Sequence, residues 1–177
     1  MHFMAEKPPQ AHDQHPLFAL HHLSHTYPDG TVALRDISLN IFAGDRIALV
    51  GQNGSGKSTL VRHLNGLIRA QQGTCTYDGQ ALTDATVDEL RRRVGILFQD
   101  PDDHLFCTTV YDDVAFGPRN QGTNEAEVDR LVRETLATVG LSDLLFKPPH
   151  HLSYGQKKRA ALAAILTMEP EVLILDE

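Results

Sequence analysis

The segment Gly51–Thr59 reads Gly-Gln-Asn-Gly-Ser-Gly-Lys-Ser-Thr and fits the phosphate-binding pattern G-x-x-x-x-G-K-[ST]. It follows the apolar run Ile47–Val50, which predicts a strand leading into a glycine loop and then a helix. Glycines let the backbone curl until its N–H groups face one anion, and the helix start adds its positive dipole end. Lys57 can then reach the β- and γ-phosphates, and the Ser58 hydroxyl is suited to ligate Mg²⁺. The pattern favours a nucleoside triphosphate site over an ordinary glycine-rich turn.

An acidic pair follows the apolar run Val172–Leu175 near the end of the chain. Four consecutive β-formers predict a strand buried on both faces, as in a parallel sheet. Ligands of such sheets bind beyond the carboxyl ends of the strands, so we expect Asp176 and Glu177 to emerge beside the phosphate loop. Asp176 is suited to hold Mg²⁺ through a water, and Glu177 is suited to accept a proton from the attacking water. Strand ends are often acidic, so this interpretation depends on the phosphate loop.

A third segment, Leu152–Gln156, reads Leu-Ser-Tyr-Gly-Gln. Ser153 and Gln156 predict a capping box at the start of a helix. The cap does not explain Gly155, which destabilises a first helical turn but lets a phosphate approach the backbone. Lys157–Arg159 place positive charges in the same turn, which is unfavourable for the helix dipole unless an anion or an acidic partner lies nearby.

These segments together resemble those of the nucleotide-binding subunits of ABC transporters. Gly51–Thr59 is similar to the Walker A loop, and Val172–Glu177 is similar to the Walker B strand with its catalytic glutamate. Leu152–Gln156 resembles the signature, usually written LSGGQ, with Tyr154 in place of the first glycine. The motifs occur in the family's order along the chain.

Two further residues extend the resemblance. Gln99 follows a predicted strand at the place of the Q-loop glutamine, and Tyr27 matches the aromatic residue that stacks on adenine. The resemblance implies ATP and Mg²⁺, and a head-to-tail pair of ATP-binding subunits, identical or different, that share two ATP molecules. The implied catalytic residues are Glu177, Lys57 and Gln99, and the implied metal-binding residues are Ser58, Gln99 and Asp176. The implied ATP contacts are Tyr27, Gly51, Asn53, Gly54, Ser55, Gly56, Lys57, Ser58, Thr59, Ser153, Gly155 and Gln156.

A finer resemblance lies in Phe98–Phe106 and Asp113–Pro118, which are similar to the ATPase subunits of energy-coupling factor importers. Those importers take up vitamins or transition metals, and the cobalt and nickel systems look closest. The implied partners are integral membrane transport subunits at the cytoplasmic face of the membrane. A solvated loop is the other interpretation of the acidic run Asp100–Asp103. The alternatives for the whole chain are a non-transport ABC ATPase and an inactive, truncated nucleotide-binding fragment.

The composition narrows the class of protein. The 177 residues carry a formal net charge of −7, which argues against nucleic acid as a partner. The polar segment Met1–Pro16 has no apolar signal-peptide core, which predicts a disordered leader and a chain that stays in the cytoplasm. Six of the ten histidines lie in the first 25 residues, so a metal-binding tail is an alternative to a merely polar leader. Cys75 and Cys107 are predicted to be reduced thiols outside any metal-ligand pattern.

The resemblance implies an α/β P-loop NTPase fold, an ABC-type nucleotide-binding domain over residues 17–177. It has a parallel core sheet, an N-terminal antiparallel β subdomain, and a helical subdomain over roughly residues 100–168 that carries the signature. Strands are predicted at Leu17–Tyr27, Val32–Leu34, Ile37–Phe42, Arg46–Val50, Thr74–Tyr77, Gly95–Phe98 and Val172–Leu175. Helices are predicted at Lys57–Leu64, Val87–Val94, Glu125–Val139 and Ser153–Met168.

The family's domain normally continues past the position of Glu177. We therefore expect the domain to be incomplete at its C-terminus, with weak or no hydrolysis by the 177-residue chain alone. A missing strand is expected to leave a sheet edge and apolar surface unpaired.

Overall fold

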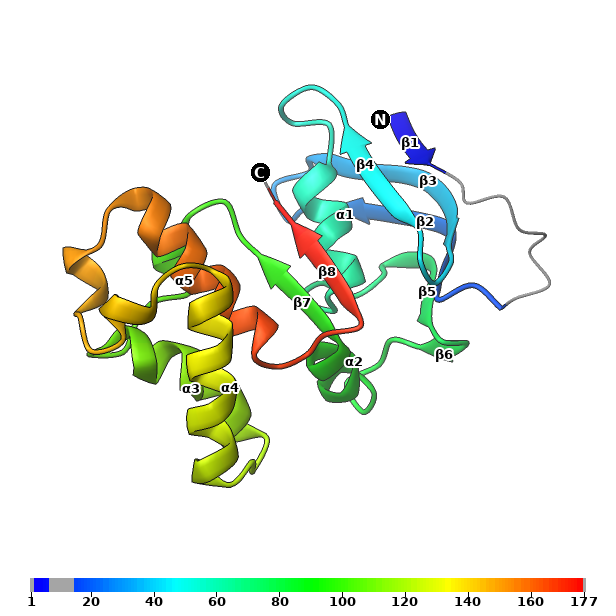
Figure 1. Cartoon of the computed structure of the whole chain (residues 1–177). Helices are drawn as coiled ribbons and strands as arrows, with labels where there is room; N and C mark the ends of the chain where they lie inside the picture. The colour runs from blue at the N-terminus through cyan, green and yellow to red at the C-terminus, as the bar shows by residue number, and fades with distance from the viewer. Residues whose placement is uncertain (1, 7–14, 177) are drawn as a thin grey trace. The chain divides into compact units, whose positions relative to one another are not determined.

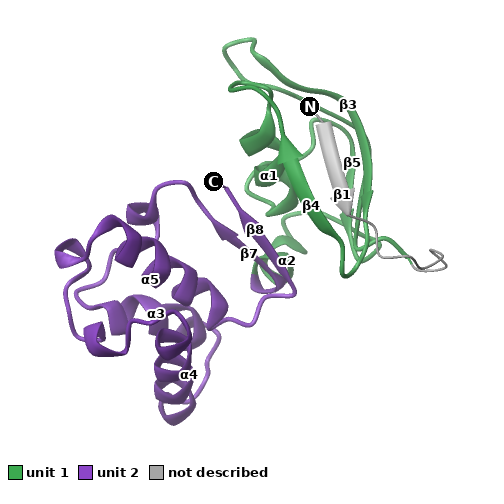
Figure 2. Cartoon of the chain, turned by 45° about the horizontal axis from the view of Figure 1, so that its top comes forward, with its two compact units in different colours: residues 1–91 green, residues 92–177 purple. Residues whose placement is uncertain are grey.

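The structure is a computed structural model that describes residues 2–6 and 15–176, with the first of these segments described as backbone (Figure 1). The chain divides into two compact units, residues 1–91 and 92–177 (Figure 2). The predicted helical subdomain lies within the second unit, which also contains two strands. None of the helices in the described ranges is both long enough and apolar enough to span a membrane.

The first unit contains an antiparallel sheet with the strand order β3-β2-β5-β6. These strands are β2 (Phe18–Thr26), β3 (Val32–Ile41), β5 (Gln72–Tyr77) and β6 (Gln80–Ala81). The prediction of two strands between residues 32 and 42 is wrong, because the chain continues as one strand. Asp36 has a φ of 51°, and the register between β2 and β3 shifts in this region. This irregularity accommodates the polar residues Arg35 and Asp36, which interrupt the apolar pattern of β3, while β3 stays paired with β2 on both sides of them.

The strand that leads into the phosphate loop is β4 (Arg46–Val50), which pairs antiparallel with β1 (His2–Glu6). The predicted disordered leader over residues 1–16 is therefore wrong for His2–Glu6, while Met1 and residues 7–14 lie outside the described residues. The backbone groups along the edge of β4 offer hydrogen bonds to a segment of matching length, which β1 supplies.

The predicted burial of β4 is also wrong. Its residues alternate between exposed and half-buried, and Val50 is 50% exposed. A strand is buried on both faces only where other layers cover both faces, and the antiparallel partner β1 does not supply such layers.

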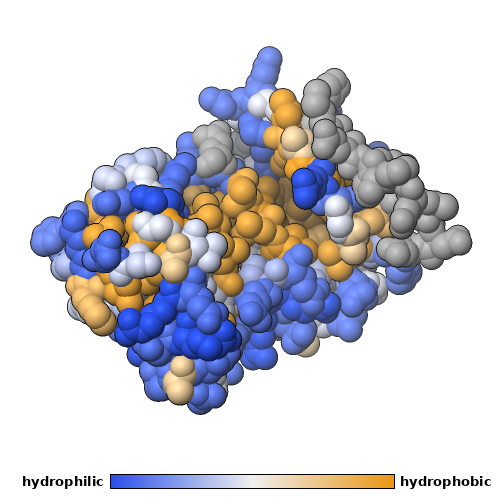
Figure 3. Space-filling model, in the orientation of Figure 1, coloured by the Kyte–Doolittle hydropathy of each residue, from blue (hydrophilic) through white to orange (hydrophobic). Residues whose placement is uncertain are grey.

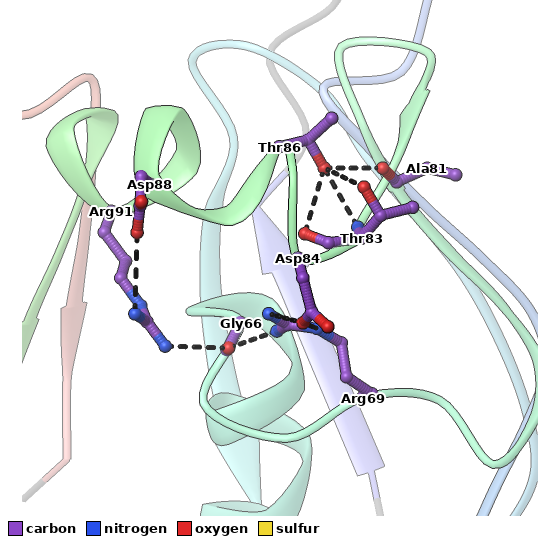
Figure 4. A network of polar contacts seen from close by, with 8 residues as sticks. All are labelled: Gly66, Arg69, Ala81, Thr83, Asp84, Thr86, Asp88 and Arg91. Atoms are coloured by element: carbon purple, nitrogen blue, oxygen red, sulfur yellow. Dashed lines mark hydrogen bonds and ion pairs between the residues drawn. The ribbon is translucent and has the colours of Figure 1, made fainter.

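Helix α1 (Lys57–Leu64) follows the phosphate loop and packs against β3 with Leu60, Val61 and Leu64 buried. Just beyond its end, the Gly66 carbonyl accepts hydrogen bonds from the guanidinium groups of Arg69 and Arg91 (Figure 4). Cations at this end of a helix offset its negative dipole end. Arg69 also pairs with Asp84 at 3.0 Å, so the network ties the end of α1 to the segment that enters α2 (Val87–Arg93).

The second unit combines a parallel strand pair with three helices. The strands are β7 (Val94–Leu97) and β8 (Val172–Leu175), and the helices are α3 (Val110–Asn120), α4 (Glu125–Thr138) and α5 (Tyr154–Leu166). Three short 3-10 helices connect them, η1 (Pro101–Asp103), η2 (Ser142–Leu144) and η3 (Pro149–His151). The predicted parallel arrangement is confirmed for β7 and β8, which pair from Val94 with Val172 to Leu97 with Leu175.

The core of the second unit lies among its three helices. The predicted helical spacing in residues 125–139 is confirmed, because Val128, Val132 and Leu136 are fully buried on one face of α4. Helix α3 was not predicted, and Pro118 lies inside it. Proline cannot donate to the carbonyl four residues earlier, but the Val114 carbonyl accepts from the Thr167 hydroxyl at 3.1 Å instead. The helix therefore continues through the proline with the help of a residue distant in sequence.

The predicted burial of β8 on both faces is wrong. Leu173 and Leu175 are 40% and 60% exposed, while Val172 and Ile174 are half-buried. Apolar residues gather at the surface over this strand (Figure 3). Pairing with β7 satisfies one edge of β8, but it leaves the leucine side chains uncovered.

Candidate nucleotide site

The phosphate loop has the left-handed backbone that its glycines allow. Gly54 and Gly56 have φ angles of 78° and 89°. A Cβ atom at Gly56 would lie 2.2 Å from the Ala33 carbonyl oxygen, so this position requires glycine. The Lys57 ammonium group donates to the carbonyl oxygens of Gly51 at 2.9 Å and Gln52 at 3.1 Å. The Lys57 side chain therefore folds back onto the start of the loop and places its positive charge beside the loop backbone.

The start of α1 is suited to an anion. Its N-cap is Gly56, no side chain caps it, and its first turn has no acidic residue. The first N–H groups of a helix have no partner within the helix, so they need one from outside it. The Ser55 hydroxyl oxygen is buried without a partner in the described part of the chain, and the Ser58 side chain is exposed. The residues present thus fit a phosphate chain with an accompanying divalent cation.

Tyr27 lies directly beside this helix. Its hydroxyl is 3.0 Å from the Thr59 hydroxyl, which brings the predicted adenine-stacking residue to the phosphate loop across 32 positions of sequence. The Thr59 side chain, predicted to bind ATP, is buried and bonded to Tyr27 in this structure.

Two buried histidines surround this contact, and the sequence interpretation missed both of them. The His25 ring meets Tyr27 edge-on at 4.9 Å and His63 at 5.0 Å. His63 Nδ1 is 2.8 Å from the Thr59 carbonyl oxygen, four residues earlier in the same helix. Burial lowers the pKa of His63, and nearby His25 lowers it further, while the hydrogen bond to Thr59 opposes the shift. The sequence signal that could have identified His63 is its spacing of four residues from Thr59, which places both residues on one face of a helix.

The predicted capping box at the signature segment is confirmed. The Ser153 hydroxyl accepts from the Gln156 amide at 3.3 Å, and the Gln156 side chain accepts from the Ser153 amide at 2.9 Å. A Cβ atom at Gly155 would meet nothing within 4 Å, so packing within the described chain does not require glycine there. The open backbone at Gly155 agrees with the approach of a group from outside the chain.

The acidic partner expected for the basic first turn of α5 is present. Lys157 pairs with Asp102 at 2.7 Å, and Asp100 caps η1 by accepting from the Asp102 amide at 3.0 Å. The acidic residues Asp100, Asp102 and Asp103 are exposed, as the solvated-loop interpretation expects, and the segment forms a 3-10 turn in which Asp102 also pairs with Lys157. Gln99 is exposed, and its carbonyl accepts from the Tyr154 hydroxyl at 3.4 Å.

Asp176 is half-buried immediately after β8, and its amide donates to the Leu97 carbonyl at 2.9 Å. This bond extends the β7–β8 ladder and holds Asp176 at the carboxyl end of the pair. Glu177 lies outside the described residues. Tyr27 and the phosphate loop belong to the first unit, whereas Gln99, the signature segment and Asp176 belong to the second. The expected approach of Asp176 and Glu177 to the phosphate loop stays a prediction.

Neither cysteine is activated. Burial raises the pKa of Cys75 to about 12, and burial together with Asp113 raises the pKa of Cys107 to about 11. Both thiols are free, as predicted. Among the residues that the structure describes, no cluster of at least three histidine, cysteine or acidic side chains is arranged to hold a metal ion. His12 lies outside those residues, so the metal-binding tail stays untested.

Comparison with known proteins agrees with this geometry. A sequence profile described as "ABC transporter" matches residues 34–177. The chain is 51% identical over 164 residues to the energy-coupling factor transporter ATP-binding protein EcfA of Methanothermobacter thermautotrophicus, covering 91% of this chain and 52% of that protein. It is 48% identical over 158 residues to EcfA of Carboxydothermus hydrogenoformans, covering 89% of this chain and 58% of that protein. The chain thus spans a little over half the length of these two relatives.

A solved structure has the same fold. The structure of cbiO1 from Clostridium perfringens, described as part of the ABC transporter complex cbiONQ, superposes with a TM-score of 0.80 at 41% identity. The match covers 93% of this chain and 66% of that one. Because the family profile covers most of the sequence and a solved relative has the same fold, the chain belongs to the ABC transporter family and has its ATPase fold.

Proposed function

We propose that this chain is the ATP-binding and ATP-hydrolysing part of a subunit that powers an energy-coupling factor importer. The observation that carries the proposal is the phosphate loop, whose left-handed glycines lead into a helix start without a side-chain cap. Tyr27 lies beside this helix at 3.0 Å from Thr59, where an adenine ring could be reached. The relatives named EcfA support the importer class.

The roles of the residues follow from their chemistry. Backbone N–H groups at the start of α1 and the Lys57 ammonium group bind the phosphates. Ser58, Gln99 and Asp176 would hold Mg²⁺, which neutralises charge on the β- and γ-phosphates when it is bound. Glu177 accepts the proton of the attacking water. In such phosphoryl transfer, positioning and charge stabilisation supply most of the rate acceleration.

The signature segment acts on a nucleotide held by a second ATP-binding subunit. Ser153 and Gly155 lie at the start of α5, where the capping box fixes the backbone and Gly155 leaves it uncovered. Closing the two subunits around ATP excludes water from the γ-phosphate and completes the site. Hydrolysis then separates the subunits and moves the membrane partners.

The proposed cargo is a transition metal ion, cobalt or nickel, or a vitamin. The resemblance of Phe98–Phe106 and Asp113–Pro118 to importer subunits supports this class. The partners are integral membrane transport subunits, which place this subunit at the cytoplasmic face of the membrane. Uptake of labelled cobalt, nickel or vitamin into vesicles that contain the assembled transporter would identify the cargo.

The test measures ATP binding and hydrolysis separately in the complete subunit assembled with its membrane partners. Lys57→Ala should abolish tight binding or turnover, whereas Arg62→Ala, which removes a positive charge from the last turn of the same helix, should leave both unchanged. Glu177→Gln should keep ATP binding but stop turnover. Unchanged hydrolysis with Lys57→Ala would overturn the phosphate-loop assignment, and normal hydrolysis with Glu177→Gln would overturn the general-base role. Wild-type binding without hydrolysis would favour the non-catalytic alternative.

A further inference from the structure

The segment Phe98–His104, here called the glutamine loop, is bonded to the first turn of α5 within the second unit. The Lys157 ammonium group donates to Asp102 at 2.7 Å, and the Tyr154 hydroxyl donates to the Gln99 carbonyl at 3.4 Å. Each contact joins residues 55 positions apart in the sequence, and the two contacts hold the loop at Gln99 and at Asp102. The residue that departs from the usual signature, Tyr154, therefore makes one of the contacts.

The glutamine loop has its own internal bonds. The Phe98 amide donates to His104 Nε2 at 3.0 Å, which ties the first residue of the loop to the last. The two rings stack with centroids 5.3 Å apart and an interplanar angle of 25°. Asp100 caps η1 by accepting from the Asp102 amide at 3.0 Å. These bonds restrain the loop internally, so a displacement of Gln99 is expected to displace Asp102 as well.

The first turn of α5 is equally well ordered. The capping box joins Ser153 to Gln156 through two hydrogen bonds. The Lys157 side chain is only 19% exposed, and its charge lies in the first helical turn, where the dipole disfavours cations. The ion pair with Asp102 offsets this penalty, so the lysine is held between helix and loop. The Lys158 ammonium group lies 5.4 Å from the centre of the Tyr154 ring, which helps to orient that ring.

We infer that Tyr154 and Lys157 are positioning residues that couple the glutamine loop to the signature turn, Ser153–Gln156, of the same subunit. The inference rests on the proposed function, in which Gln99 would hold the Mg²⁺ of one nucleotide while Ser153 and Gly155 contact the nucleotide of the second subunit. A shift of Gln99 is then transmitted through Asp102 to the first turn of α5. The link makes the two nucleotide sites of the dimer respond to each other.

Charge reversal tests the link in the complete subunit assembled with its membrane partners. Asp102→Lys and Lys157→Asp should each lower the turnover number about fivefold or more, with a smaller effect on ATP affinity because the phosphate loop is untouched. The double variant, which restores an ion pair with reversed charges, should recover most of the turnover. Asp103→Lys is the matched control, since it makes the same charge change one residue away and Asp103 has no ion pair within the described part of the chain. Wild-type turnover in both single variants, or no recovery in the double variant, would overturn the link.

If the wild-type protein shows no ATP turnover, the proposed function fails, and a second measurement is needed to test the link by itself. Hydrogen exchange is then compared in the wild type and Asp102→Lys. The variant should exchange faster both in the glutamine loop and at the amides of residues 153–157, and the double variant should reverse both changes. Faster exchange in the loop alone would overturn the coupling, whatever the activity of the protein.

Discussion

Replacing Gly56 by alanine tests the geometry of the phosphate loop, and Gly54→Ala is its matched control. Both glycines are left-handed, with φ angles of 89° and 78°, so either alanine costs roughly 1–2 kcal/mol of conformational energy. At Gly54 the new Cβ meets nothing within 4 Å, but at Gly56 it lies 2.2 Å from the Ala33 carbonyl oxygen. Real Cβ atoms essentially never come closer than 3.0 Å, so the loop and β3 must separate by 3.0 − 2.2 = 0.8 Å.

The two variants should therefore lose different amounts of folding stability. Gly54→Ala should lower the free energy of unfolding by about 1–2 kcal/mol. Gly56→Ala adds an overpacking penalty of roughly 1–3 kcal/mol, for a total near 2–5 kcal/mol. Because the clash displaces the start of α1 from β3, ATP affinity should also fall at least about tenfold in Gly56→Ala, or 1.4 kcal/mol.

Urea denaturation gives the free energies of unfolding, and calorimetric titration with ATP gives the affinities. Arg62→Ala, on the same helix but away from the loop, controls for general effects on α1. Equal losses of stability in Gly54→Ala and Gly56→Ala would refute the argument, because the contact with Ala33 would then contribute nothing. An unchanged ATP affinity in Gly56→Ala would show that the loop tolerates the displacement.

Three other substitutions test separate parts of the molecule. Gly155→Ala should raise the free energy of unfolding by about 0.5–1 kcal/mol, since the new Cβ meets no atom within 4 Å. The same variant should lower ATP turnover in the assembled dimer. A lower thermal midpoint would mean that this glycine is needed for folding. His63 has a pKa lowered by burial, so the unfolded chain binds its proton more tightly, and stability should fall as pH drops below about 6.5. His63→Gln should reduce that loss between pH 7.5 and 5.5 in urea titrations, and an identical pH dependence would contradict the assignment. Thr109→Ala removes the side-chain cap of α3 and should cost about 1 kcal/mol, whereas Thr108→Ala should cost much less; similar effects would disprove the cap.

The local features of this chain could be predicted because near neighbours decide them. The glycines of Gly51–Thr59 adopt the left-handed backbone that their type permits, and Ser153 and Gln156 form the capping box that their spacing indicates. The burial of Val128, Val132 and Leu136 follows from helical periodicity. For the loop and the cap the relevant contacts lie within a few residues, and for α4 the periodicity indicates which face is buried but not what covers it.

Burial of strands could not be predicted in the same way. The apolar runs of β4 and β8 indicated strands, but their exposure depends on which layers cover them, and Val50 and Leu175 remain 50% and 60% exposed. Helix α3 was not predicted, and it contains Pro118, a residue type that disfavours the interior of a helix. The Thr167 hydroxyl, far along the chain, lies 3.1 Å from the Val114 carbonyl oxygen, the acceptor that Pro118 leaves without its helical donor.

By itself the sequence determined the class of site: a phosphate loop, an aromatic residue at Tyr27 and a signature segment in the order of an ABC ATPase. Tertiary structure alone decided which side chains meet. It brought the Tyr27 hydroxyl to Thr59, surrounded that contact with His25 and His63, and paired Lys157 with Asp102. Motifs depend on residue types at short spacing, which selection for chemistry leaves visible in the sequence. Contacts across 32 or 55 positions depend on how the elements pack, and no local pattern specifies them.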